Sequence, residues 1–353
     1  MARIPTQNRY PDRAGYTVLN TDTNQLEVFS DGTYIPVGPE LLQGVGPELL
    51  QGVGYEPNGV NYENESDLNP IIITVGPGKD FEYLDEAVWH VYKQNLYDSS
   101  FSSVNNSQTL SLKQFKIVIS NDFIFDKCYV FQNMFLPNLE ITQEDYNIPL
   151  LVNGYAAIHL KNNTTINKIK LNLEGSTNTP LRDSGIKLWY NSHINRLQLK
   201  AKKMLYGVTL EYNSKIDLIY IDNANQLQRS ALFLMYNCFA LLIIAHISDV
   251  GITYPYSAAN GIWVNQSDLR IYYGQNVTID NVVSGFRIME QGRIVISGGN
   301  LNISNATNGI QFAFNGGSLI AKPATITYTN VTNEINPTTI IPNEWNPNGI
   351  VII

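Results

Sequence analysis

The chain has 353 residues, which is enough for one large hydrophobic core or for two domains. Its formal net charge of −8 and pI near 5.1 argue against a nucleic-acid partner, because phosphate backbones attract clusters of Lys and Arg. The two cysteines, Cys128 and Cys238, fit neither a disulfide framework nor a metal cluster, so we expect no metal site and no cofactor. No apolar run is long enough for membrane insertion, and no secretory signal is recognisable in the first residues.

Residues 1–36 are predicted to form a small separate β module. The sequence from Tyr16 to Ile35 reads as three short strands, with turn residues at 22–24 and 31–32. Residues 37–69 connect this module to the rest and contain the octapeptide VGPELLQG twice. The repeat is either a plain duplicated linker or a stalk. In a stalk, four leucines would meet their copies around a symmetry axis: Leu41, Leu42, Leu49 and Leu50.

The remaining residues, 70–353, are predicted to begin with a strand and a helix. The segment 82–94 carries apolar residues at helical spacing, namely Leu84, Ala87, Val88 and Val91. We expect this helix to cap a stack of strands, because an open end would expose core side chains and unpaired backbone groups. A loop is predicted at 96–112, followed by short strands at 115–119 and 139–142.

From Ala157 to Tyr328 the sequence repeats every 22–30 residues, and each unit opens with a small residue. If each opening is position zero, positions one and three are apolar in every unit, which predicts strands with one inward face. A near-fixed period of this length predicts a parallel β-solenoid, whose units stack and share one core. The openings are Ala157, Gly185, Gly207, Ala231, Gly261, Gly285 and Gly309.

Equivalent residues of successive units should stack one strand spacing apart. One inward column is therefore predicted from Ile186, Val208, Leu232, Ile262, Phe286 and Ile310. Position six holds an amide or a hydroxyl in every unit, and we expect these side chains to hydrogen-bond along a ladder. The members of this second column are Asn163, Asn191, Asn213, Asn237, Ser267, Gln291 and Asn315.

The repeats resemble the right-handed parallel β-helix of the pectate-lyase-like fold over about residues 71–353. The segment NTDTNQLEVFSDGTYIPV resembles the N-terminal anchoring hairpins of phage tail fibres and tailspikes. The resemblance implies an all-β virion protein with an N-terminal anchoring module and an N-terminal capping helix. It further implies a homotrimer, made in the host cytoplasm and located in the phage tail. The N-terminus would attach it to other virion proteins.

The resemblance also implies recognition of a polysaccharide on the host cell surface. A fold does not by itself give an activity, so two alternatives stay open. The chain could be a depolymerase, hydrolase or lyase, that cuts capsule or lipopolysaccharide, or it could be a purely structural virion protein. The calcium-binding acidic cluster and the arginine of pectate lyases are not recognisable in this sequence.

Aromatic and charged residues recur at the outward positions two and four. Sugars stack on aromatic rings beside polar groups, so this face is a candidate glycan platform. The alternative is that it packs against another subunit. An insertion at about residues 247–260 adds two tyrosines on a loop. The candidate glycan-binding residues are Trp189, Phe233, Trp263, Arg287, Tyr254 and Tyr256.

Three residues are weak catalytic candidates. Asp222 and His246 occupy position fifteen of successive units, where they could form an acid–base pair or merely a surface ion-pair ladder. Glu211 lies at position four, but no second carboxylate neighbours it on that face, whereas a glycosidase normally uses two.

Positions eleven and thirteen turn apolar halfway along the solenoid. They predict an outward patch that a symmetric oligomer would cover, made of Leu218, Tyr220, Leu242 and Ile244. Association of three chains, with their β-helices side by side, is the arrangement that we expect.

Overall fold

A computed structural model describes residues 2–4, 17–20, 25–30, 33–36, 70–101, 113–176, 184–251, 259–313, 317–321, 325–336 and 350–352. The chain divides into two compact units, Met1–Asp67 and Leu68–Ile353. The first unit contains a four-stranded sheet in which β2 pairs in parallel with β1 and antiparallel with β3, and β3 pairs antiparallel with β4. These strands are β1 (Ala2–Ile4), β2 (Thr17–Asn20), β3 (Gln25–Ser30) and β4 (Thr33–Pro36).

The strand–turn–strand–turn–strand order predicted between Tyr16 and Ile35 is therefore present as β2, β3 and β4. The four leucines of the octapeptide repeat lie outside the described residues, so the choice between linker and stalk stays a prediction.

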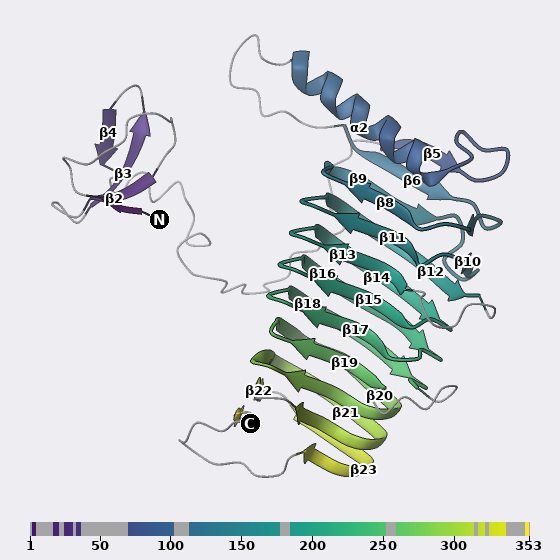
Figure 1. The fold of residues 1–353 in the computed structure, drawn as a ribbon, viewed down its shortest axis with the longest axis vertical. Coiled ribbons are helices and arrows are strands. Elements are labelled where there is room, and N and C mark those ends of the chain that lie inside the picture. Colours follow the sequence, from purple (N-terminus) through teal and green to yellow (C-terminus); the bar gives the residue numbers. More distant parts are fainter. Residues whose placement is uncertain are drawn as a thin grey trace. The chain divides into compact units, whose positions relative to one another are not determined.

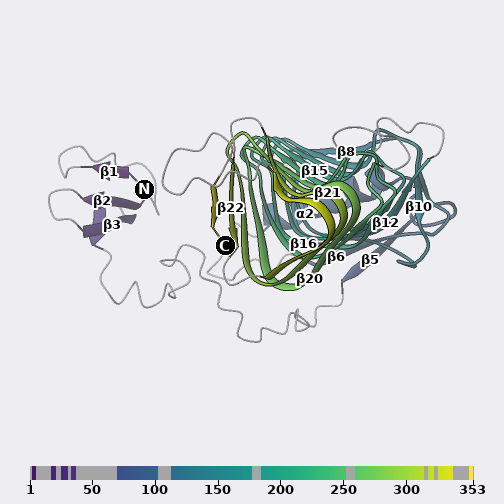
Figure 2. The ribbon, with the colours of Figure 1, turned by 90° about the horizontal axis from the view of Figure 1, so that it is seen from below.

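The second unit is a parallel β-solenoid of about eight turns, and Figure 1 shows its strands stacked in chain order. Figure 2 looks along the stack and shows the coils superimposed around a common core. The short strands are β5 (Ile71–Val75), β6 (Phe115–Ile119), β7 (Ile124–Phe125), β8 (Tyr129–Gln132), β10 (Leu150–Val152), β11 (Ala156–Lys161), β13 (Ser184–Trp189), β15 (Tyr206–Glu211), β17 (Ser230–Met235), β19 (Asn260–Asn265), β22 (Gly317–Ala321) and β24 (Ile350–Ile352).

The longer strands are β9 (Phe135–Gln143), β12 (Thr165–Gly175), β14 (His193–Lys202), β16 (Lys215–Asn225), β18 (Phe239–Ser248), β20 (Asp268–Met289), β21 (Gly292–Ala313) and β23 (Thr325–Asn336). Near the C-terminus the bend between strands disappears, and β20 and β21 each run through two sides of the coil. The final strand β24 pairs in parallel with β22.

Helix α2 (Leu84–Phe101) lies across the N-terminal end of the stack (Figure 1). Leu84, Ala87, Val88 and Val91 are all fully buried against the first coils, which confirms the predicted cap. The helix extends further than predicted, through residues assigned to a loop, because residues 95–101 contain no Pro or Gly that would stop it. Among the described residues, no helix is long and apolar enough to cross a membrane.

The predicted inward column is confirmed. Ile186 pairs with Val208, and the register continues through Leu232, Ile262 and Phe286 to Ile310. All six side chains are fully buried. The small residue that opens each unit is required by close approach of the next coil. A Cβ built on Gly207, for example, would lie 2.6 Å from the carbonyl oxygen of Ala231.

We predict that Phe286→Asp lowers the free energy of unfolding by several kcal/mol, because it places an unpaired carboxylate in the middle of this column. Chemical denaturation measures the loss. Phe286→Leu, which keeps an apolar side chain, is the matched control and is expected to cost much less. Equal losses for the two variants would contradict the stacked core.

The position-six column differs from its prediction. Asn163, Asn191, Asn213 and Asn237 have φ values of 59–61°, the left-handed conformation that asparagine tolerates well. Hydrogen bonds along the column come from backbone N–H groups, for example from Asn191 to the carbonyl of Tyr212 at 2.9 Å. The asparagine side chains themselves are exposed. The backbone of the turn, rather than a side-chain ladder, explains why asparagine recurs.

Two further features of these turns were not predicted. In three successive turns the next residue, Thr164, Ser192 or Ser214, donates its hydroxyl to the carbonyl three residues earlier, at 2.6–2.8 Å. Ser267 belongs to this inner column and not to the asparagine column. The turn before it is one residue shorter, since Met235 pairs with Asn265 and Phe239 with Asp268.

Candidate functional site

The outward side of β11, β13, β15, β17, β19 and the end of β20, here called the short-strand face, carries four of the six predicted glycan-binding residues: Trp189, Phe233, Trp263 and Arg287. The register brings Phe233, Trp263 and Arg287 into one column. Their side chains pack on each other, with ring centroids of Phe233 and Trp263 4.8 Å apart and the Arg287 guanidinium 5.1 Å from the Trp263 centroid. Only 7% of Phe233 is exposed. The side chains of this column thus largely cover one another, and their role in glycan binding stays a prediction.

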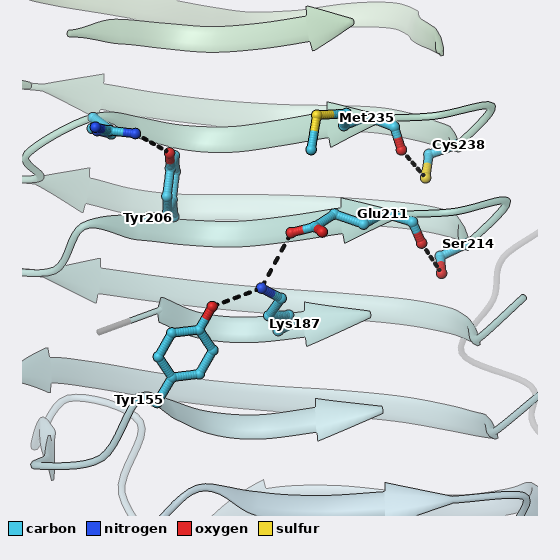
Figure 3. A network of polar contacts seen from close by, with 8 residues as sticks. Tyr155, Lys187, Tyr206, Glu211, Ser214, Met235 and Cys238 are labelled. Carbon is cyan, nitrogen blue, oxygen red and sulfur yellow. Dashed lines mark hydrogen bonds and ion pairs between the residues drawn. The ribbon is translucent and has the colours of Figure 1, made fainter. Parts of the chain in front are cut away.

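A charged network occupies the N-terminal half of the same face (Figure 3). The Lys187 ammonium lies 3.2 Å from the Glu211 carboxylate, 2.9 Å from the Tyr155 hydroxyl and 4.4 Å from the Trp189 ring centroid. The side chains of Lys187 and Glu211 are only 6% and 11% exposed. Glu211 is therefore neutralised by a lysine on the neighbouring strand, and no second carboxylate joins it in this network.

His159 lies beside this network, with its ring 5.0 Å from that of Trp189 in an edge-to-face contact. Burial, and secondarily the positive charges of Lys161 and Lys187, lower the pKa of His159 to about 3. The imidazole is consequently neutral at physiological pH and cannot act there as a general acid. Its buried Nε2 and the buried Nε1 of Trp189 have no hydrogen-bond partner.

Next to this face runs a ladder of three tyrosines that the sequence analysis missed. Tyr190, Tyr212 and Tyr236 follow β13, β15 and β17, and successive ring centroids are 4.7 and 4.9 Å apart with nearly parallel planes. All three have φ values of 50–63°, which are rare for a bulky side chain and store strain. The repeated dipeptide Tyr-Asn at residues 190–191, 212–213 and 236–237 was the available signal.

The stacked geometry leaves an open ring face only at the two ends of this tyrosine ladder. Tyr190 and Tyr236 are 45% and 37% exposed. Beyond Tyr236 the column continues with Gln266, because the preceding residue Met235 pairs with Asn265. A hollow of about 550 Å³ lies at this place, lined by Asn237, Cys238, Phe239, Gln266, Ser267, Asp268 and Gln291. We call it the Gln266 hollow. It combines amides and one carboxylate beside the end of an aromatic stack.

A second groove, of about 300 Å³, lies at the opposite bend of the last coils. Here a true side-chain ladder exists, since Asn305 donates to Asp280 at 2.8 Å and Asn330 donates to Asn305 at 3.1 Å. Asn281 likewise donates to Asp249 at 2.8 Å. The side-chain amides of this groove are thus bonded to each other or to aspartate carboxylates, whereas, among the described residues, the side-chain amides of Gln266 and Gln291 make no hydrogen bond.

The structure does not bring Asp222 and His246 together. Asp222 accepts hydrogen bonds from the Tyr146 hydroxyl at 2.9 Å and from the Gln198 amide at 2.7 Å. The exposed His246 instead contacts the Thr278 hydroxyl through Nδ1 at 2.9 Å. The reason is a bulge in β16, where Lys200 pairs with Asn223 and Asp222 is displaced from the column counted in the sequence.

The predicted interface patch needs one correction. Leu242 is fully buried in the core. Between the pairs Ile216–Ala240 and Ile219–Leu242, β16 contains one residue more than β18. This bulge shifts the alternation of inward and outward positions by one residue, so that Leu242 points inward. The outward apolar residues of β16 and β18 are instead Leu218, Tyr220, Leu241, Ile243 and Ile244, all partly exposed. Tyr254 and Tyr256 lie outside the described residues.

No family model, curated protein or solved structure matches this chain. Within the described part of the chain, no group of three or more His, Cys, Asp or Glu side chains is placed to hold a metal ion. Cys128 is partly buried and Cys238 is buried, and both are free thiols. Functional inference therefore rests on the geometry of the solenoid surface.

Proposed function

We propose that this chain is a component of a phage tail fibre or tailspike and that it binds a host cell-surface glycan at the Gln266 hollow. The observation that carries the proposal is the exposed tyrosine ladder, whose last member Tyr236 directly precedes Asn237 in the lining of a hollow of amide and carboxylate groups. One face of a sugar ring is lined by C–H groups and packs on an aromatic ring, while its hydroxyls need donors and acceptors nearby. Gln266, Gln291 and Asn237 supply both kinds, and Asp268 supplies strong acceptors.

Backbone strain supports a functional role for the tyrosine ladder. Left-handed backbone costs of order 1–3 kcal/mol when the residue is bulky, and asparagine or glycine would fit each position with less strain. Stacking between neighbouring rings offsets about 0.5–1.5 kcal/mol of this cost per pair. Stacking alone does not account for the hydroxyl groups of the tyrosines. The Tyr236 ring is partly exposed at the end of the ladder, which is consistent with a surface that binds a ligand.

The proposal is binding rather than cleavage of the glycan. Among the described residues that line the Gln266 hollow, Asp268 is the only carboxylate, whereas hydrolysis of a glycosidic bond normally uses two. Incubation with capsular polysaccharide or lipopolysaccharide separates the possibilities. Bound glycan of unchanged length supports the proposal, released oligosaccharides would establish a depolymerase, and no binding would favour a structural virion protein.

We predict that Tyr236→Ala weakens glycan binding about tenfold, equivalent to about 1.4 kcal/mol. The substitution removes the ring of the residue that precedes Asn237 and keeps the amides that line the hollow. Tyr190→Ala is the matched control, because it removes one ring of the same ladder at the end far from the hollow. Binding titrations of both variants, with thermal unfolding to confirm folding, measure the effect. An equal loss in the two variants would place the glycan elsewhere on the ladder.

Assembly as a homotrimer, attached to the tail through the N-terminal module, completes the proposal. The corrected apolar patch of Leu218, Tyr220, Leu241, Ile243 and Ile244 offers a surface that other copies would cover. Burial of each large apolar side chain contributes about 1.5–3 kcal/mol before the costs of association.

For assembly we predict a solution mass of three times the 39.6 kDa of one chain, measured by light scattering. Ile244→Lys should shift this mass toward the monomer and leave the unfolding transition of each chain in place. A stable monomer of the unaltered protein at micromolar concentration would contradict the trimer.

A further inference from the structure

Three cations lie on the outward side of β12 and β14, and none of them lines the Gln266 hollow. Its members are Lys170, Arg196 and Lys200, all partly exposed. Within the described part of the chain, none of the three forms an ion pair with a carboxylate. In contrast, the neighbouring Lys168 pairs with Glu140 at 3.3 Å, and Lys203 pairs with Glu174 at 2.7 Å. We call Lys170, Arg196 and Lys200 the basic cluster.

Aromatic rings hold these cations in place. The ammonium groups of Lys170 and Lys200 lie 4.7 and 4.5 Å from the Tyr146 ring centroid, and the Arg196 guanidinium lies 4.8 Å from that of Tyr220. Tyr146 belongs to the turn after β9, and its hydroxyl reaches Asp222 on β16. Burial, and then the charge of Asp222, raise the pKa of Tyr146, so its hydroxyl remains a donor to this carboxylate.

Only part of the hydrogen-bonding capacity of the cluster is used. Lys200 donates to the Tyr146 carbonyl and to the Asn147 side chain, both at 3.4 Å. The Nε of Arg196 is buried and has no hydrogen-bond partner. The carboxylate of Asp222 accepts hydrogen bonds from Tyr146 and Gln198 and forms no ion pair with the three cations. The ammonium groups of Lys170 and Lys200 lie against the same Tyr146 ring and repel each other, and Arg196 lies two residues before Gln198, the register partner of Lys170. An anionic ligand would relieve the repulsion and occupy the free donors.

We propose that the basic cluster binds the acidic groups, carboxylate or phosphate, of a charged polysaccharide. This inference rests on the proposed role in glycan recognition and specifies the class of glycan as acidic. The chain carries a net charge of −8, so an acidic polymer would be repelled from most of its surface and directed to this cluster. Nucleic acid also presents phosphate groups, so tight binding of DNA would contradict the proposal.

The test uses the full chain and four fluorescently labelled polymers: polygalacturonate, phosphomannan, neutral dextran and duplex DNA. Binding is followed by anisotropy at 50 and 300 mM NaCl. We expect polygalacturonate or phosphomannan to bind, whichever acidic group fits, and binding to weaken at the higher salt concentration. Dextran and DNA should bind at least tenfold more weakly than the preferred acidic glycan.

Two double variants change the net charge equally. Lys170→Gln with Lys200→Gln should weaken binding of the acidic glycan at least tenfold. Lys202→Gln with Lys203→Gln, which removes lysines already paired with Glu174, should change it less than threefold. Thermal unfolding of both variants confirms that they fold.

Equal losses in the two double variants, tight binding of DNA, or no binding of either acidic glycan would overturn the inference. The results also distinguish failure of this inference from failure of the proposed function. Binding of a neutral surface glycan that depends on Tyr236 and not on the basic cluster would keep the proposed function and remove this inference, whereas absence of all glycan binding would remove both.

Discussion

Leu242→Lys is expected to unfold the solenoid or to lower its free energy of unfolding by at least about 4 kcal/mol. Leu242 is fully buried and pairs with Ile219 and Ile271 in the inward stack. The substitution removes a core leucine and leaves an ammonium group without a partner among apolar side chains. Chemical denaturation, with far-UV circular dichroism as the signal, measures the loss.

The adjacent residue provides the control. Leu241 is partly exposed and lies beside Arg270 on the outward side of the neighbouring strand. Leu241→Lys should change the free energy of unfolding by less than about 1 kcal/mol, as is usual for surface substitutions. If Leu241→Lys unfolds the chain while Leu242→Lys is tolerated, the register between β16 and β18 is wrong and the two faces are exchanged.

Glu211→Ala is expected to cost about 3–5 kcal/mol, because it removes the carboxylate partner of the buried Lys187 ammonium. Tyr155 and Trp189 remain beside the ammonium but carry no negative charge to balance it. The free energy of unfolding of this variant measures the effect. A loss of less than 1 kcal/mol would mean that water reaches Lys187 and that the network in Figure 3 is open.

A double variant separates the charge effect from packing. Lys187→Met combined with Glu211→Leu replaces both members by apolar side chains of similar size, and such exchanges are often neutral or stabilising. We therefore expect the double variant to recover most of the stability lost in Glu211→Ala. The matched single variant Lys187→Met should be destabilised as well, since it leaves Glu211 unpaired.

Much of the fold followed from the sequence, because the solenoid repeats one local rule. A two-residue period with a small residue at the opening fixed the inward column through Phe286, and helical spacing identified the cap around Val88. The same counting failed where a coil gained or lost a residue. Extra residues in β16, relative to β14 at Asp222 and relative to β18 before Leu242, moved these two residues to other columns, and a period of two makes each such shift reverse the face.

The candidate site was less accessible from the sequence. Trp189 and Glu211 were placed on the correct face, but their partner Lys187 was identified only once the register was known. The tyrosine ladder escaped notice because bulky residues are not expected at left-handed positions of a turn. The basic cluster depends on Tyr146, whose turn contacts strands far along the chain.

The most direct test of the account is a binding titration of the full chain against a panel of capsular polysaccharides and lipopolysaccharides, with the length of the bound chains measured afterwards. We predict saturable binding of at least one glycan, unchanged chain length and about tenfold weaker binding by Tyr236→Ala. Absence of binding across the panel, or full binding by Tyr236→Ala, would contradict the assignment of glycan recognition to the Gln266 hollow.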